Sequence, residues 1–178
     1  MAVHTSVESM LLESLAEYFA VAELAMERKD GISGEYGYPA AALLFIIASS
    51  IGSYFEKSEG VTIDIEGNKR TISNDSHHLY ILNSDTYEQQ SLTEARIKRV
   101  RDSFRGPLVH NGAIAFNVVA LTRGRETDPV FRDAGSCEVV NLSAFLSLTS
   151  RAINRFRVDL TKVLAASKIA KTLYTRSK

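Results

Sequence analysis

Hydrophobic side chains recur at intervals of three and four residues over most of this chain, which is the spacing of an amphipathic α-helix. The pattern predicts helices over about residues 5–29, 92–104, 107–121 and 141–170. A fifth helix, opened by Pro39 and running to Phe55, is apolar on nearly every face. A helix of this kind is expected in the middle of a bundle rather than on its surface.

Polar residues mark where the first and last of these helices begin. Thr5-Ser6-Val7-Glu8 predicts a capping box, in which the Thr5 hydroxyl and the Glu8 carboxylate each accept a hydrogen bond from a free backbone N–H. The last helix is expected to start near Asn141 or Ser143, and the tail from Lys171 to Lys178 is expected to fray.

Residues 61–72 change the period from helical to alternating. Apolar residues stand at every second position there, namely Val61, Ile63 and Ile65. Gly67-Asn68 follows them and supplies a turn, so the segment predicts a β-hairpin. A lone two-stranded hairpin is marginal in water, and we therefore expect it to lean on the helices or on a partner.

Together these elements predict an all-α fold, a bundle of about five helices that carries the small β-hairpin as an insertion. A single domain is expected over residues 1–178, because the length fits one domain and no internal repeat occurs. One further short strand is expected over Cys137–Asn141, after a loop over residues 128–136. The sequence contains no Walker loop, GxGxxG, HExxH or nucleophile elbow.

The composition favours a cytoplasmic protein. Cys137 is the only cysteine, which excludes a disulfide framework and indicates a reducing compartment. The N-terminus does not have the pattern of a signal peptide, and the apolar stretch from Tyr38 to Phe55 falls short of the roughly 20 apolar residues of a membrane span. His77-His78 has no Cys or acidic pair at ligand spacing, so we expect neither a metal nor a cofactor.

The formal net charge is zero, but the two halves of the chain are oppositely charged. Residues 1–90 hold 14 acidic and 5 basic side chains, a charge of −9, whereas residues 91–178 hold 7 acidic and 16 basic side chains, a charge of +9. This asymmetry is typical either of a surface that faces a polyanion or of acidic and basic helices packed against each other.

Residues 103–112, SFRGPLVHNG, do not follow the scaffold pattern. Pro107 suits the first position of a helix, which makes Gly106 the N-cap, with Arg105 just before it and His110 as the fourth helical residue. Side chains at these last two positions meet across a helix start. We therefore expect the Arg105 guanidinium and the His110 imidazole to lie close together.

An arginine and a histidine at a helix start have the chemistry of a phosphate site. The helix N-terminus attracts phosphate, and Arg105 adds a forked set of donors. Both disfavour the protonated imidazole, so His110 would be the neutral form that a general base requires. In RNA this base could take the proton of a 2′-hydroxyl, whose oxygen then attacks the adjacent phosphorus without a metal.

The same residues also fit a structural role. Arg105 could form an ion pair with an acidic residue of the first half, and His110 could bond a buried carbonyl. Asn111 could either orient a substrate or bond the loop. Spacing alone leaves both alternatives open.

Arg105 to His110 has the form R-x4-H at a helix start, after a helix that ends in an aromatic residue, and Asn111-Gly112 follows it. In this motif and in the order of its elements the chain resembles the HEPN superfamily (higher eukaryotes and prokaryotes nucleotide-binding domain). The run EVVNLSAFLSL into the last helix is also similar to bacterial members. The resemblance covers most of the chain in layout and about ten residues in motif.

The resemblance implies a homodimeric, metal-independent endoribonuclease of toxin–antitoxin or other defence systems, with Arg105 and His110 as the catalytic pair in a dimer cleft. Other members of the superfamily are inactive modules that bind RNA, a nucleotide or a partner protein such as an antitoxin or accessory protein. Gly106 departs from the polar residue often found after the motif arginine, a departure that bears on catalysis more than on fold or dimerisation.

Three hypotheses follow. In the first, a HEPN-like dimer binds single-stranded RNA and cleaves it through Arg105 and His110, and further RNA contacts come from Arg96, Arg99, Arg101 and Asn111. In the second, the chain is a catalytically inactive HEPN-like module that binds a nucleotide or a protein partner. In the third, it is a structural helical protein whose charge asymmetry is neutralised internally.

Overall fold

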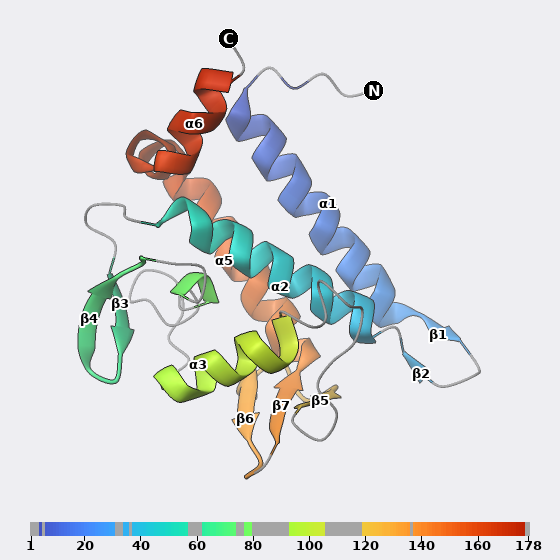
Figure 1. The fold of residues 1–178 in the computed structure, drawn as a ribbon. Helices are drawn as coiled ribbons and strands as arrows, with labels where there is room; N and C mark the ends of the chain where they lie inside the picture. The colour runs from blue at the N-terminus through green and yellow to red at the C-terminus, as the bar shows by residue number, and fades with distance from the viewer. Residues whose placement is uncertain are drawn as a thin grey trace.

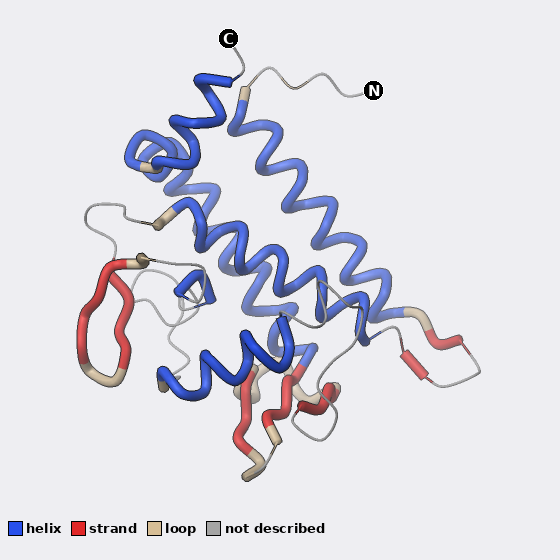
Figure 2. The backbone as a smooth tube through the Cα atoms, viewed as in Figure 1, coloured by secondary structure: helices blue, strands red, loops and turns tan. Residues whose placement is uncertain are grey.

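The computed structural model describes residue 4 and residues 6–30, 34–35, 37–56, 62–73, 77–79, 93–105, 119–135 and 137–176. Helices make up most of this part of the chain (Figures 1 and 2). They are α1 (Val7–Glu27), α2 (Gly37–Tyr54), α3 (Glu94–Val100), α5 (Leu142–Ala166) and α6 (Lys168–Arg176). A π-helical segment, η2 (Arg101–Arg105), continues α3.

The start of α1 confirms a capping box but moves it by one residue. Ser6 is the N-cap, and its hydroxyl accepts a hydrogen bond from the Ser9 N–H at 3.1 Å. The Ser9 hydroxyl accepts in return from the Ser6 N–H at 3.3 Å. Thr5 lies outside the described residues. Ser6 and Ser9 are three residues apart, as are the predicted Thr5 and Glu8. A serine hydroxyl can accept a backbone hydrogen bond at either position of the capping box.

Helix α2 is the centre of the core, as its apolar composition predicted. It packs against α1 and α5, and the long helices form one layered bundle (Figure 1). The Phe45 ring meets the Phe145 ring edge-on at 5.0 Å, and Phe156 of α5 lies near the rings of Tyr54 and Phe55. By length and composition α2 could cross a membrane, but 56% of that span is buried inside the fold, as in the core helix of a soluble protein.

The predicted hairpin is confirmed, but its turn is Glu66-Gly67, one residue before the predicted Gly67-Asn68. Strands β3 (Thr62–Ile65) and β4 (Asn68–Thr71) pair antiparallel through a two-residue turn. Glu66 and Gly67 both have positive φ, of 53° and 79°, as a type I′ turn requires. Ile63, Ile65 and the following Ile72 are buried, so the hairpin leans on the helical core through one face.

The remaining strands correct the all-α expectation. β5 (Val119–Thr122), β7 (Glu138–Asn141) and β6 (Phe131–Asp133) form a three-stranded sheet in that spatial order, with β5 parallel and β6 antiparallel to β7. A two-residue pair, β1 (Lys29–Asp30) with β2 (Gly34–Glu35), joins α1 to α2. The fold is therefore mostly helical with small sheets.

Around this sheet, the helix predicted over 107–121 is wrong at residues 119–121, the loop predicted over 128–136 is wrong at β6, and the strand predicted over Cys137–Asn141 is confirmed. β5 occupies the end of the segment predicted as a helix over 107–121, whose residues 107–118 lie outside the described part. A four-residue apolar run cannot separate strand from helix by its period, and pairing with β7 decides here. β6 lies within the predicted loop, whereas β7 agrees with the strand predicted over Cys137–Asn141.

Helix α5 begins directly after β7, near where the sequence predicted it. Asn141 is its N-cap, and the Asn141 Oδ1 accepts a hydrogen bond from the Ala144 N–H at 3.4 Å. The helical path breaks at Ser167, and α6 then runs to Arg176, so the prediction of a frayed tail is wrong over residues 171–176. The start of α1 and α6 lie at the same end of the molecule (Figure 1).

Candidate functional site

The helix that leads into the motif is α3–η2. Thr93 caps it by accepting a hydrogen bond from the Arg96 N–H at 3.3 Å, and Arg105 is the last residue of η2. The side chain of Arg105, His110 and Asn111 lie outside the described residues, so their mutual geometry stays a prediction. A π-helical turn is rare and is found disproportionately at functional sites, and here it includes Arg105, which the sequence had predicted to lie between two helices.

Arg96, predicted to contact RNA, lies at the junction between α3 and the sheet. Its guanidinium forms an ion pair with both oxygens of Glu138 in β7, and its Nη2 also donates to the Phe131 carbonyl of β6 at 2.8 Å. The Glu138 side chain is fully buried, and that of Arg96 is 20% exposed. Most donors of Arg96 are therefore engaged within the protein.

Arg99 and Arg101, the other predicted RNA contacts on this helix, are more exposed. Nη1 of Arg99 lies 3.7 Å from both Asp133 Oδ1 and Glu138 Oε2. Arg101 lies 3.5 Å from its neighbour Asp102. Arg96 and Arg99 thus converge on one buried carboxylate and fasten α3 to the sheet, while their contact with RNA stays a prediction.

The adjacent histidines are held by separate groups. The His78 Nε2 lies 3.1 Å from the Glu56 Oε2, and this histidine is buried. The His77 Nδ1 accepts a hydrogen bond from the Ser73 N–H at 3.3 Å. The two rings therefore serve different partners at the end of α2 and after the hairpin.

A buried asparagine organises the turn that follows β5. The Asn141 Oδ1 accepts a hydrogen bond from the Gly124 N–H at 2.9 Å, and its Nδ2 donates to the Arg125 carbonyl at 2.8 Å. Asp128 closes the same turn by accepting from the Arg125 N–H at 3.1 Å. Arg123 and Arg125 are both exposed, so the turn presents two cations on a fixed backbone.

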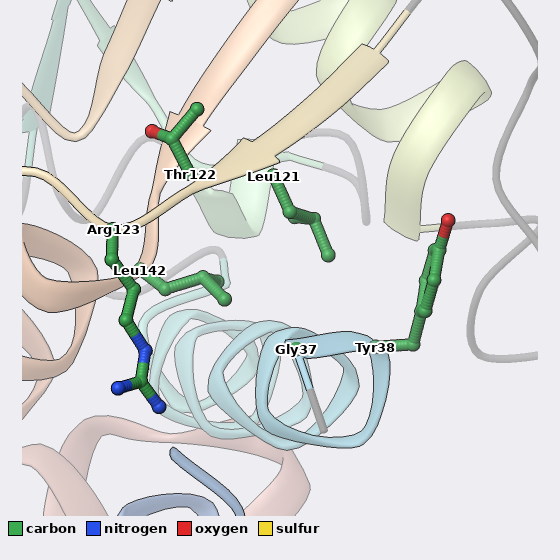
Figure 3. Close-up of a pocket in the computed structure, with 6 residues that line it drawn as sticks. All are labelled: Gly37, Tyr38, Leu121, Thr122, Arg123 and Leu142. Carbon is green, nitrogen blue, oxygen red and sulfur yellow. The ribbon is translucent and has the colours of Figure 1, made fainter. Parts of the chain in front are cut away.

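Beside this turn lies a cavity of about 230 Å³, lined by Gly37, Tyr38, Leu121, Thr122, Arg123 and Leu142. Figure 3 shows the side chains of Leu121 and Leu142 pointing into the space in front of Gly37, with Tyr38 on one side and Arg123 on the other. The lining comes from the start of α2, the end of β5 and the start of α5.

The helix surfaces carry opposite charges. Helix α1 holds five glutamates and no basic residue, whereas residues 142–176 hold seven basic residues and one acidic residue. We define the cationic face of α5 and α6 by its exposed basic residues, Arg151, Arg155, Arg157, Lys162, Lys168 and Lys171.

Among the described residues, Arg157, Lys162 and Lys168 of the cationic face form no ion pair with the glutamates of α1. Arg155 pairs along its own helix with Asp159 at 3.1 Å, and Glu13 of α1 pairs with His4. Within the part of the chain that the structure describes, Arg157, Lys162 and Lys168 form no ion pair. Glu138 is the buried carboxylate on which two arginines, Arg96 and Arg99, converge.

We found no match for this chain among protein-family models, curated proteins or solved structures. The resemblance to the HEPN superfamily therefore rests on the motif and the order of elements.

The sequence predicted Asn141 as a helix start, but it did not predict the bonds of Asn141 to the turn after β5, the role of Glu138 or the cavity beside Tyr38. The sequence gives a weak indication that Glu138 is paired. It directly precedes the apolar residues of β7, where a buried charge costs free energy unless it has a partner. No local pattern marks Tyr38 and Arg123 as neighbours, since more than eighty residues separate them.

Proposed function

We propose that this chain is an RNA-binding protein whose main electrostatic contact is the cationic face of α5 and α6. The observation that carries the proposal is the net charge of +6 over residues 142–176, with three of its exposed cations unpaired among the described residues. Phosphate contacts by Lys and Arg supply most of the affinity in sequence-independent binding to nucleic acid.

The arrangement along α5 supports this proposal. Arg151, Arg155 and Lys162 follow one stripe at spacings of four and seven, which places them on a single side of the helix. Val158, 78% exposed, lies between them in the same stripe. A row of cations along a helix can track a phosphate backbone over several nucleotides.

The stronger form of the proposal is metal-independent cleavage of single-stranded RNA by a HEPN-like homodimer. Arg105 would hold the scissile phosphate, and His110 would take the proton of the 2′-hydroxyl. The fixing of α3 by Glu138 supports this role, because a rigid helix would deliver η2 and Arg105 to a constant place. The R-x4-H resemblance supplies the assignment of the pair.

Cleavage is tested with purified protein, single-stranded RNA and EDTA. We expect wild-type protein to cleave and His110→Ala to lose at least about 100-fold in rate, the usual contribution of general acid–base catalysis. His77→Ala is the matched control at a histidine outside the motif and should cleave as the wild type does. Equal cleavage by wild type and His110→Ala, or none by either, would remove the catalytic proposal.

Binding is tested by salt titration of a labelled single-stranded RNA. Lys162→Gln combined with Lys168→Gln should reduce the slope of log K against log salt by about 1.4, since each phosphate contact contributes roughly 0.7. Arg28→Gln combined with Lys69→Gln is the control, because it removes two cations from the first half of the chain. An unchanged slope in the first variant would contradict the proposed surface.

A second candidate function is a catalytically inactive HEPN-like module that binds a protein partner. It is favoured by Gly106 in the motif and by exposed apolar side chains on α1. These are Met10, Tyr18, Val21 and Leu24, between 38% and 54% exposed. This function predicts binding that changes little with salt, whereas RNA binding weakens steeply.

A further inference from the structure

The cavity beside Tyr38 lies at the N-termini of two helices and at the carboxyl ends of two parallel strands. Helices α2 and α5 both begin there, at Gly37 and Leu142. The parallel strands β5 and β7 both end there, with Thr122 paired to Asn141. Helix N-termini carry partial positive charge, and crevices at the carboxyl ends of parallel strands commonly bind ligands. An anionic group is therefore favoured in this cavity.

The floor of the cavity is apolar and open toward α2. A Cβ added to Gly37 would lie 3.4 Å from Leu142 Cδ1 and 3.5 Å from Leu121 Cδ1, so the missing side chain leaves the two leucines facing the helix backbone. Tyr38 is 51% exposed, and its ring stands along one side (Figure 3). An exposed tyrosine beside apolar groups suits a planar ring that stacks on it.

Arg123 forms the opposite side of the cavity, and its side chain runs past Leu142 at the edge of the space rather than into it (Figure 3). The next residue, Gly124, is bonded to the buried Asn141. A Cβ on Gly124 would approach Asn141 Nδ2 to 2.6 Å, so the backbone of this turn lies directly against the asparagine. A guanidinium on a fixed turn can bind a phosphate without first ordering the loop.

The size of the cavity limits its occupant. Pockets for drug-sized ligands have volumes of about 300–1,000 Å³, and this one has about 230 Å³. One planar ring with its anionic group would fit, but a dinucleotide cofactor would not. We infer that this cavity binds a single nucleotide unit, with the base between Tyr38 and the leucines and the phosphate at Arg123. A nucleotide within RNA and a free mononucleotide have the same chemistry. That the bound nucleotide belongs to RNA therefore rests on the proposed function.

The test measures binding of a labelled single-stranded RNA by fluorescence anisotropy and of the four nucleoside monophosphates by saturation-transfer NMR. Tyr38→Ala should weaken RNA binding by about 5- to 100-fold, the usual effect of removing one stacking aromatic, and Tyr38→Phe should stay within about 2-fold. Tyr18→Ala is the matched control at an exposed tyrosine on α1 and should bind as the wild type does. Arg123→Gln should weaken binding and reduce the salt slope by about 0.7.

The outcomes separate this inference from the proposed function. If wild-type protein binds RNA and neither Tyr38→Ala nor Arg123→Gln changes the affinity, the cavity is not a nucleotide site and the proposed function stands. If RNA does not bind but mononucleotides do, and Tyr38→Ala abolishes their signal, the cavity inference stands and the RNA proposal fails. Absence of both signals in the wild type overturns both.

Discussion

The Arg96 guanidinium reaches the fully buried Glu138 carboxylate across the junction between α3 and the central strand of the sheet. The two residues are 42 positions apart, and the contact also includes the Phe131 carbonyl. This ion pair joins the helix that precedes the motif to the strand that leads into α5. Its integrity therefore decides where η2 and Arg105 lie relative to the core.

Replacing Glu138 by leucine should destabilise the fold strongly. Removing one partner of a buried pair leaves an uncompensated charge and typically costs about 3–5 kcal/mol in free energy of unfolding. Denaturant unfolding measures the change. Arg70→Ala is the control, because its pair with Glu94 is about half exposed and such pairs contribute roughly 0–1 kcal/mol. A loss below that of the control would show that the buried pair does not hold the junction.

Thr149→Val is expected to stabilise the protein. The Thr149 hydroxyl is buried in α5 and has no hydrogen-bond partner among the described residues. An unsatisfied buried hydroxyl costs about 1–3 kcal/mol, and valine has nearly the same shape, so the free energy of unfolding should rise by roughly 1 kcal/mol. Thr161→Val, at an exposed position of the same helix, should change it little. A drop for Thr149→Val would mean that the hydroxyl has a partner.

Stability should fall at alkaline pH in part through Tyr54. Burial raises the pKa of the Tyr54 hydroxyl above its ordinary value of 10.0. Above pH 10 the unfolded chain releases this proton while the folded protein retains it, so rising pH favours unfolding. Unfolding measured from pH 8 to pH 11 should show a smaller loss for Tyr54→Phe than for wild type. Tyr18→Phe, at an exposed tyrosine, is expected to follow the wild type, and identical profiles for all three would contradict the prediction.

Two glycine substitutions should have opposite effects. Gly124→Ala would push a methyl group to 2.6 Å from Asn141 Nδ2 and disturb the cap of α5, at a cost of about 1–3 kcal/mol. Gly37→Ala meets its neighbours at ordinary distances in the first turn of α2 and should stabilise by about 0.4–1 kcal/mol. Thermal unfolding of both variants measures the difference. Equal effects would show that Gly124 can shift freely.

The sequence predicted the long elements and missed the short ones for physical reasons. α2 was predictable because every face is apolar, and the hairpin because alternation and Gly67 coincide. β5 was mistaken for helix, since four residues are too few for a period to show and only the pairing with β7 makes them a strand.

The candidate site was predictable only in part. The helix leading to the motif was predicted over residues 92–104, and α3–η2 runs one residue further, to the motif residue Arg105. The partner of Arg96 could not be predicted, because ion pairs between distant segments depend on packing rather than spacing. The same holds for the cavity, whose lining comes from residues 37–38, 121–123 and 142.

Asn141 ends β7 and caps α5, and no loop separates the two elements. A slip of β7 by one residue against its neighbours would carry the start of the 25-residue helix along by roughly 3.3 Å. That displacement would pull the buried side chains of α5 out of their places against α2. The packing of α5 against α2 therefore fixes the register of β7, and with it the pairing of the three short strands.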